Sequence, residues 1–202
     1  MKNLRSLIAV PFVLVFVFLM LASPARSETY TFSASVCGSS DLDHSYYYMW
    51  AMNWNLPSGE IITGATLTYN NIWDWTVEND YLYTHLLDLD IQALATGVYS
   101  AWDFQWPADA FANMGLLLGV WSDPGGGWPS NFDLVYNIPS SFFWWLSDGQ
   151  FGFGADPDCH YYNSGITLEI NTIHTPEPAT MILLGSGLLG LAGLARRRFR
   201  KQ

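Results

Sequence analysis

The chain carries its basic residues only at its two ends. All eight lysine and arginine residues lie before residue 27 or after residue 195, and residues 28–175 contain none. Of the eighteen carboxylates, only Glu177 lies outside that stretch. Without lysine or arginine, this stretch cannot form the salt bridges that would neutralise its carboxylates. It also lacks the cationic side chains that bind the phosphates of nucleic acids. Residues 28–175 therefore form a body with a formal charge of about −17, which excludes nucleic acid as its partner.

The central stretch reads as a single domain of strands and turns. It holds all ten tryptophans and all eleven tyrosines, in short runs separated by glycine, asparagine, aspartate and proline. This pattern is typical of strands, and almost no amphipathic helix interrupts it. We predict an all-β, antiparallel two-sheet sandwich with jelly-roll as the preferred topology. Strands are expected at 29–36, 46–56, 63–69, 72–77, 81–90, 97–106, 116–121, 132–138, 151–155 and 166–172, with a helical turn or buried bridge at 142–146.

Residues 1–27 have the features of a secretory signal helix. Lys2 and Arg5 precede an apolar stretch over 7–21, and Ala25-Arg26-Ser27 is a small-x-small cleavage site. We predict export by the Sec machinery and cleavage by signal peptidase before Glu28. The alternative is an uncleaved N-terminal anchor.

Residues 176–202 are organised differently from the rest. Pro176-Glu177-Pro178 is followed by an uncharged run over 179–195 and then by the basic residues Arg196, Arg197 and Arg198. A helix of this run would be about 25 Å long, close to the ~30 Å hydrocarbon core of a bilayer. The run therefore predicts a short transmembrane helix, with a buried core helix as the alternative. The basic end should stay cytoplasmic, which places residues 28–175 across the membrane.

These three features, in this order, resemble the PEP-CTERM sorting signal of Gram-negative bacteria. The resemblance implies recognition by an exosortase-type protease that cleaves near the tripeptide. It further implies transit through the inner membrane and delivery to the cell envelope or extracellular matrix, in bacteria that make exopolysaccharide. Residues 152–166 also resemble the closing segment of small jelly-roll-like domains of unassigned activity that carry such tails.

The two cysteines, Cys37 and Cys159, follow the first predicted strand and precede the last. An even pair in an exported domain favours a disulfide, which would tie the two ends of the sandwich together. The alternative is a pair of buried free thiols. Neither is a redox centre, because Cys-x-x-Cys is absent.

The predicted disulfide would also bring four carboxylates to one edge. They lie within six residues of one cysteine or the other: Asp41, Asp43, Asp156 and Asp158. Oxygen ligands without nearby arginine suit Ca²⁺, so we predict a structural calcium ion there. The alternative is that these are solvated turn aspartates that cap their own backbone.

The aromatic residues suggest a binding role. Exposed indoles could act as platforms for sugar rings, whereas the alternative is that they pack in the core. The candidates are Trp73, Trp75, Trp102, Trp106 and Trp128. Histidines near acids in sequence, His160 beside Asp158 and His85 before Asp88, could orient a general base, but no catalytic motif accompanies them.

We therefore expect a non-enzymatic structural or interaction protein of the envelope or exopolysaccharide matrix. A carbohydrate-binding module is the alternative, with polysaccharide as its partner, and an unrecognised hydrolase is the third reading.

Overall fold

The computed structural model describes residues 26–35, 41–89, 96–123, 125–126, 132–175 and 178–199. The chain divides into two compact units, Glu28–Thr172 and the terminal segments Met1–Ser27 with Ile173–Gln202. The first is the β domain. Most of the predicted signal peptide, 1–25, lies outside the described residues, and so do Cys37, Trp128, Pro176 and Glu177.

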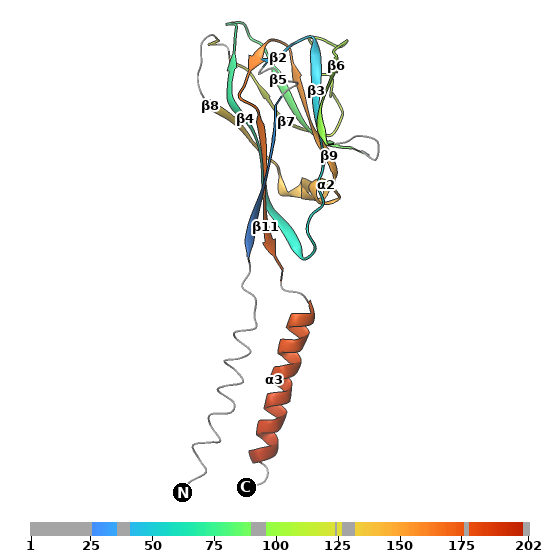
Figure 1. Ribbon diagram of the computed structural model, residues 1–202, viewed down its shortest axis with the longest axis vertical. Coiled ribbons are helices and arrows are strands. Elements are labelled where there is room, and N and C mark those ends of the chain that lie inside the picture. Colours follow the sequence, from blue (N-terminus) through green and yellow to red (C-terminus); the bar gives the residue numbers. More distant parts are fainter. Residues whose placement is uncertain are drawn as a thin grey trace. The chain divides into compact units, whose positions relative to one another are not determined.

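The predicted strands are present, with shifted ends, and two further strands of two residues join them (Figure 1). In chain order the strands are β1 (Ser27–Ala34), β2 (Asp41–Leu42), β3 (Tyr46–Asn53), β4 (Glu60–Asp74), β5 (Leu82–Asp88), β6 (Gly97–Trp102), β7 (Leu116–Trp121), β8 (Phe132–Asn137), β9 (Gln150–Pro157), β10 (Tyr161–Tyr162) and β11 (Ile166–His174). Between β8 and β9 lie η1 (Ser140–Phe142) and α2 (Phe143–Ser147), so the segment predicted at 142–146 is helical.

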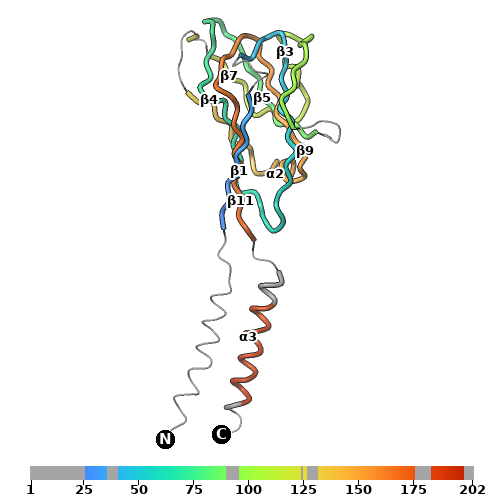
Figure 2. The backbone as a smooth tube through the Cα atoms, viewed as in Figure 1, coloured from blue at the N-terminus to red at the C-terminus, as the bar shows by residue number. Residues whose placement is uncertain are grey.

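The strands form two sheets whose order is consistent with a jelly roll. Without the short strands β2 and β10 and the edge strand β6, eight strands remain in the described chain. One sheet runs β1-β11-β4-β8, the first, eighth, third and sixth of these, and the other runs β3-β9-β5-β7, the second, seventh, fourth and fifth. This is the interleaved order of two Greek keys. Figure 2 shows the first strand, β1, beside the last, β11.

One apolar core lies between the sheets. Strand β1 alternates between exposed and half-buried positions, as expected for an edge strand, whereas all of β9 except Gln150 is buried. Side chains from both sheets meet in one cluster, including Leu67 and Leu168 from the first sheet and Leu86 and Phe153 from the second. A polar contact also crosses this core, since the hydroxyl groups of Tyr69 and Thr84 lie 3.1 Å apart.

Strand β4 covers two predicted strands because the residues between them form a bulge. Its register against β8 shifts between Tyr69 and Ile72, and Asn71 has a φ of 49°. Asparagine tolerates this left-handed conformation, so the chain bends there without leaving the sheet. Because the strand is continuous, Trp73 and Asp74 at its end pair with strand β10.

The predicted transmembrane helix over 179–195 forms part of helix α3 (Pro178–Phe199), but its predicted membrane-spanning character is not confirmed. Within the described residues, no helix is both long enough and apolar enough to cross a membrane. The helix has 22 residues, but its last part is occupied by arginines, and the uncharged run 179–195 falls short of a ~30 Å hydrocarbon core. Pro178 stands at the first helical position, where its missing N–H is tolerated.

Candidate functional site

The candidate site lies where the two shortest strands, β2 and β10, pair with each other and with the end of β4. β10 pairs with β2 on one side, joining Tyr161 to Leu42, and with the end of β4 on the other, joining Tyr162 to Trp73. Three segments far apart in sequence are thereby brought together, namely 41–45, 73–76 and 158–162.

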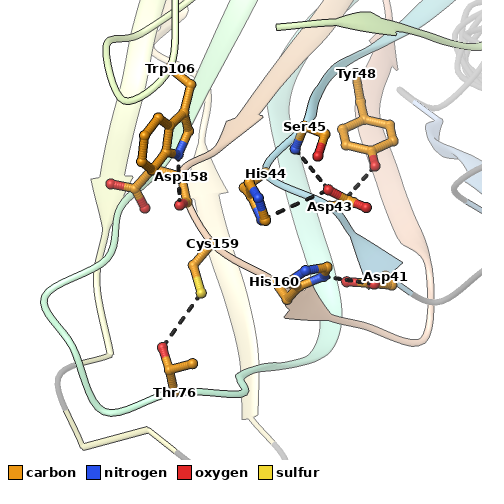
Figure 3. A network of polar contacts seen from close by, with 10 residues as sticks. All are labelled: Asp41, Asp43, His44, Ser45, Tyr48, Thr76, Trp106, Asp158, Cys159 and His160. Carbon is orange, nitrogen blue, oxygen red and sulfur yellow. Dashed lines mark hydrogen bonds and ion pairs between the residues drawn. The ribbon is translucent and has the colours of Figure 1, made fainter.

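The imidazole rings of His44 and His160 lie next to each other, close to the carboxylate of Asp43 (Figure 3). The rings of His44 and His160 lie 5.0 Å apart, edge to face. His44 Nδ1 is 3.8 Å from Asp43 Oδ1, and His160 Nδ1 is 2.9 Å from Asp41 Oδ2. We call Asp41, Asp43, His44 and His160 the histidine–aspartate cluster.

Asp43 is fixed in place by its own turn. The backbone N–H of Ser45 donates to Asp43 Oδ1 at 2.7 Å, and the backbone N–H of Asp43 donates to the hydroxyl of Tyr48 at 2.9 Å. Burial raises the pKa of Asp43, but the hydrogen bonds from Ser45 and the nearby His160 and His44 outweigh it, so that the pKa lies below its ordinary value. The carboxylate is therefore ionised at neutral pH.

Two exposed indoles and one half-buried tyrosine lie next to the histidines of the cluster. Trp106 lies 6.2 Å from the His44 ring and Trp75 lies 6.1 Å from the His160 ring, and these indoles are 55% and 58% exposed. Tyr162 lies near-parallel to Trp75, at 27° and 6.2 Å. We call Trp75, Trp106 and Tyr162 the aromatic rim. The indole N–H of Trp106 donates to the carbonyl of Asp158, which fixes the orientation of this ring.

The other tryptophan candidates differ in their surroundings. Trp73 stacks on Tyr162 at 4.5 Å and 18°, so that it supports the rim from a half-buried position. Trp102 is exposed and meets Tyr46 edge to face at 5.3 Å. Trp128 lies outside the described residues. Of the four predicted platforms that the structure describes, Trp75 and Trp106 are therefore the two exposed rings next to the histidines of the cluster.

A second group of possible ligands lies near the end of β4. The fully buried carboxyl group of Asp74 has one oxygen within 4.8 Å of ligand atoms of Asp80 and Cys159. Thr76 connects this group, because its hydroxyl donates to Asp80 at 2.7 Å and lies 3.5 Å from the Cys159 sulfur. Burial, together with Asp80 and Asp123, raises the pKa of Asp74 to about 6, although the Thr76 N–H lowers it. We call Asp74, Asp80 and Cys159 the aspartate–cysteine cluster.

The four aspartates predicted to bind calcium do not form one group of ligands in the described chain. Asp41 and Asp43 belong to the histidine–aspartate cluster, whereas Asp156 is buried in β9 and accepts the N–H of Ala110 at 2.6 Å. Asp158 accepts the backbone N–H of Tyr81. Calcium binding stays a prediction. Two of its four proposed ligands, Asp41 and Asp43, lie beside the imidazoles of His160 and His44.

The predicted disulfide is not seen. Within the described residues Cys159 forms no disulfide; it is half-buried, and burial raises the pKa of its thiol to about 11. Its predicted partner, Cys37, lies outside the described residues, so the pairing stays a prediction.

Neither histidine pairs with the acid suggested by its sequence neighbourhood. His160 contacts Asp41 rather than Asp158, and the buried His85 contacts Asp109 rather than Asp88, at 2.9 Å. The other nitrogen of His85 lies 3.0 Å from the carbonyl of Met114. Both nitrogens of the His85 ring thus face acceptors, which suits a structural role more than proton transfer.

Comparison with known families identifies one match, to the PEP-CTERM protein-sorting motif, over residues 174–198. The chain carries this sorting motif. It marks an exported protein that is processed by an exosortase at the membrane and sorted to the cell envelope. The match includes Arg196, Arg197 and Arg198, which close helix α3, and it leaves the β domain unassigned. No curated protein matches the chain.

Proposed function

We propose that the β domain is an interaction module of the envelope or exopolysaccharide matrix that binds carbohydrate at the aromatic rim. The observation that carries this proposal is the pair of exposed indoles, Trp75 and Trp106, each next to a histidine of one polar cluster. Sugar rings stack their C–H faces on aromatic rings, while carboxylates and imidazoles accept or donate hydrogen bonds to sugar hydroxyls.

The charge of the domain narrows the class of sugar. Residues 28–175 carry seventeen carboxylates and no lysine or arginine. A polyanionic polysaccharide would be repelled by this surface, whereas neutral or amino-bearing sugars would not. We therefore propose a neutral or cationic glycan as the ligand.

The route of the protein completes the proposal. The N-terminal features support export by the Sec machinery and cleavage by signal peptidase, and the sorting motif supports a final position in the envelope or matrix of a Gram-negative bacterium. We propose binding rather than catalysis, because no catalytic motif accompanies the histidine–carboxylate pairs and the His85 that faces Asp109 is buried.

A glycan array probed with the exported protein tests the proposal. The Trp75→Ala and Trp106→Ala variants should each weaken binding to the preferred glycan about five- to twelvefold, because each loses a stacking contact of about 1–1.5 kcal/mol. Trp144→Ala is the matched control, since this tryptophan is also 58% exposed but lies on α2 outside the rim. Binding that is equally weakened by all three substitutions, or by none, would contradict the rim as the site.

The absence of any glycan binding would favour the second candidate, a structural matrix component that acts through its fold alone. Turnover of a bound glycan that fails on Asp43→Asn would instead favour a hydrolase.

A further inference from the structure

We propose that the histidine–aspartate cluster binds a divalent transition-metal ion, best matched by Zn²⁺, through Asp43, His44 and His160. One carboxylate oxygen and one nitrogen from each ring lie within 4.8 Å of one another. Imidazole nitrogen and carboxylate oxygen are ordinary zinc donors, with bonds of about 2.0–2.2 Å. Three protein ligands would leave the fourth position of a tetrahedral ion to water or a bound ligand. The site goes beyond the proposed carbohydrate binding and does not depend on it.

Asp41, the fourth member of the cluster, would not bind the metal itself but would hold the His160 ring that does. His160 Nδ1 lies 2.9 Å from Asp41 Oδ2, so it donates its proton to Asp41 and leaves Nε2 as the nitrogen with a free lone pair. Histidines that bind metals commonly donate their other N–H to a carboxylate, which sets the tautomer and holds the ring in place. Asp41 is therefore a positioning residue for the metal.

The surrounding charge also favours a cation. No lysine or arginine occurs in residues 28–175 to compete for the carboxylate of Asp43, and the backbone N–H of Ser45 holds that carboxylate in place. The side chains of Asp43, His44 and His160 are all partly exposed, so an ion can enter and the rings can turn to close around it. The present separations, such as 3.8 Å between His44 and Asp43, require only small rotations to reach the ~3.3 Å between donors of a tetrahedral zinc ion.

The composition of the cluster disfavours the alternatives. Calcium takes ~6–8 oxygen ligands, whereas this cluster offers two imidazoles and the oxygens of two aspartates. The aspartate–cysteine cluster is less suitable, because the carboxyl group of its Asp74 is fully buried, whereas the three proposed zinc ligands are all partly exposed to an entering ion. Its Asp80 also already accepts the Thr76 hydroxyl.

Zinc titration of the full-length chain, without a polyhistidine tag and stripped of metal by a chelator, tests the proposal. We expect one Zn²⁺ per chain, and Co²⁺ in its place should give the visible absorption of a tetrahedral site. The His44→Ala/His160→Ala double variant should lose this site, whereas His174→Ala, which removes an exposed histidine outside the cluster, should keep it. Asp41→Asn should weaken zinc binding about 10–100-fold, as expected for an outer carboxylate.

Melting curves in chelator show whether each variant is folded, and the single variants His44→Ala and His160→Ala replace the double variant if it is not. Zinc binding that is unchanged in the His44 and His160 variants would overturn the proposal. Zinc binding that is lost instead on Asp74→Asn would also overturn it, because the metal would then occupy the aspartate–cysteine cluster. Calcium binding without zinc binding at micromolar metal would equally contradict it. Glycan binding measured with and without chelator reports separately on the carbohydrate proposal.

Discussion

Replacing Asp156 with asparagine should stabilise the protein at alkaline pH. Asp156 is only 3% exposed, and its Oδ2 accepts the N–H of Ala110 at 2.6 Å. Its Oδ1 has no hydrogen-bond partner in the described chain. An ionised carboxylate in this position lacks both water and a counter-ion, whereas the amide of asparagine keeps the acceptor for Ala110 and carries no charge.

The size of the effect follows from the pKa. Burial, and after it the charges of Asp103, Asp109 and Asp158, raise the pKa of Asp156 from 3.8 to about 7, although the Ala110 N–H lowers it. A pKa difference of one corresponds to ~1.36 kcal/mol, so the ionised group should lower the free energy of unfolding by up to ~4 kcal/mol at pH 8. Between pH ~4 and ~7 the carboxyl group of Asp156 is protonated in the folded state and ionised in the unfolded state. The free energy of unfolding is therefore undiminished at pH ~4 and falls by this amount as the pH rises from ~4 through ~7.

Urea denaturation followed by tryptophan fluorescence measures this difference. At pH 8, Asp156→Asn should be more stable than the parent chain by a few kcal/mol, and the difference should shrink toward zero near pH 4. Glu78→Gln is the control, since Glu78 is exposed and its substitution should change little. A difference between Asp156→Asn and the parent that is the same at pH 4 and pH 8, or a variant that is less stable at pH 8, would refute the argument.

Three further substitutions test the packing of the β domain by the same urea denaturation. Leu86→Ala removes a fully buried side chain of the core and should destabilise the domain by about 2–5 kcal/mol, and a loss below 1 kcal/mol would contradict the assigned core. Gly115→Ala should destabilise it by more than ~1 kcal/mol, because Gly115 has a φ of 63° and a methyl group there would overlap the carbonyl oxygen of Leu86. Tyr69→Phe should cost about 1–3 kcal/mol by leaving the buried hydroxyl of Thr84 without its partner, whereas the same change at the exposed Tyr81 should cost little.

Much of the β domain could be predicted because its strands carry local signals. Alternating polarity and turn residues place β3, β7 and β8 within a few residues of their observed ends. The bulge at Asn71 was predicted as a break between two strands, since two adjacent asparagines resemble a turn. Strands β2 and β10 have two residues each, which is too short for any periodic pattern.

The histidine–aspartate cluster could be predicted only in part. The pairing of Asp41 with His160 joins residues 119 positions apart, so no local pattern reports it. The sequence brings residues 41–43 near residues 156–158 only through the predicted disulfide, and it does not predict that His44 and His160 meet there. What the sequence could not supply is which side chains turn toward each other, and this depends on the pairing of β10 with β2.

The intact mass of the protein recovered from outside the inner membrane tests the central claim, that an acidic β domain is exported and sorted by its C-terminal motif. We expect a chain that begins at Glu28 and ends near the Pro176-Glu177-Pro178 tripeptide. The same mass reports whether Cys37 and Cys159 have lost two hydrogens to a disulfide. Recovery of the unprocessed 202-residue chain, folded in the cytoplasm, would show that the β domain is neither exported nor sorted.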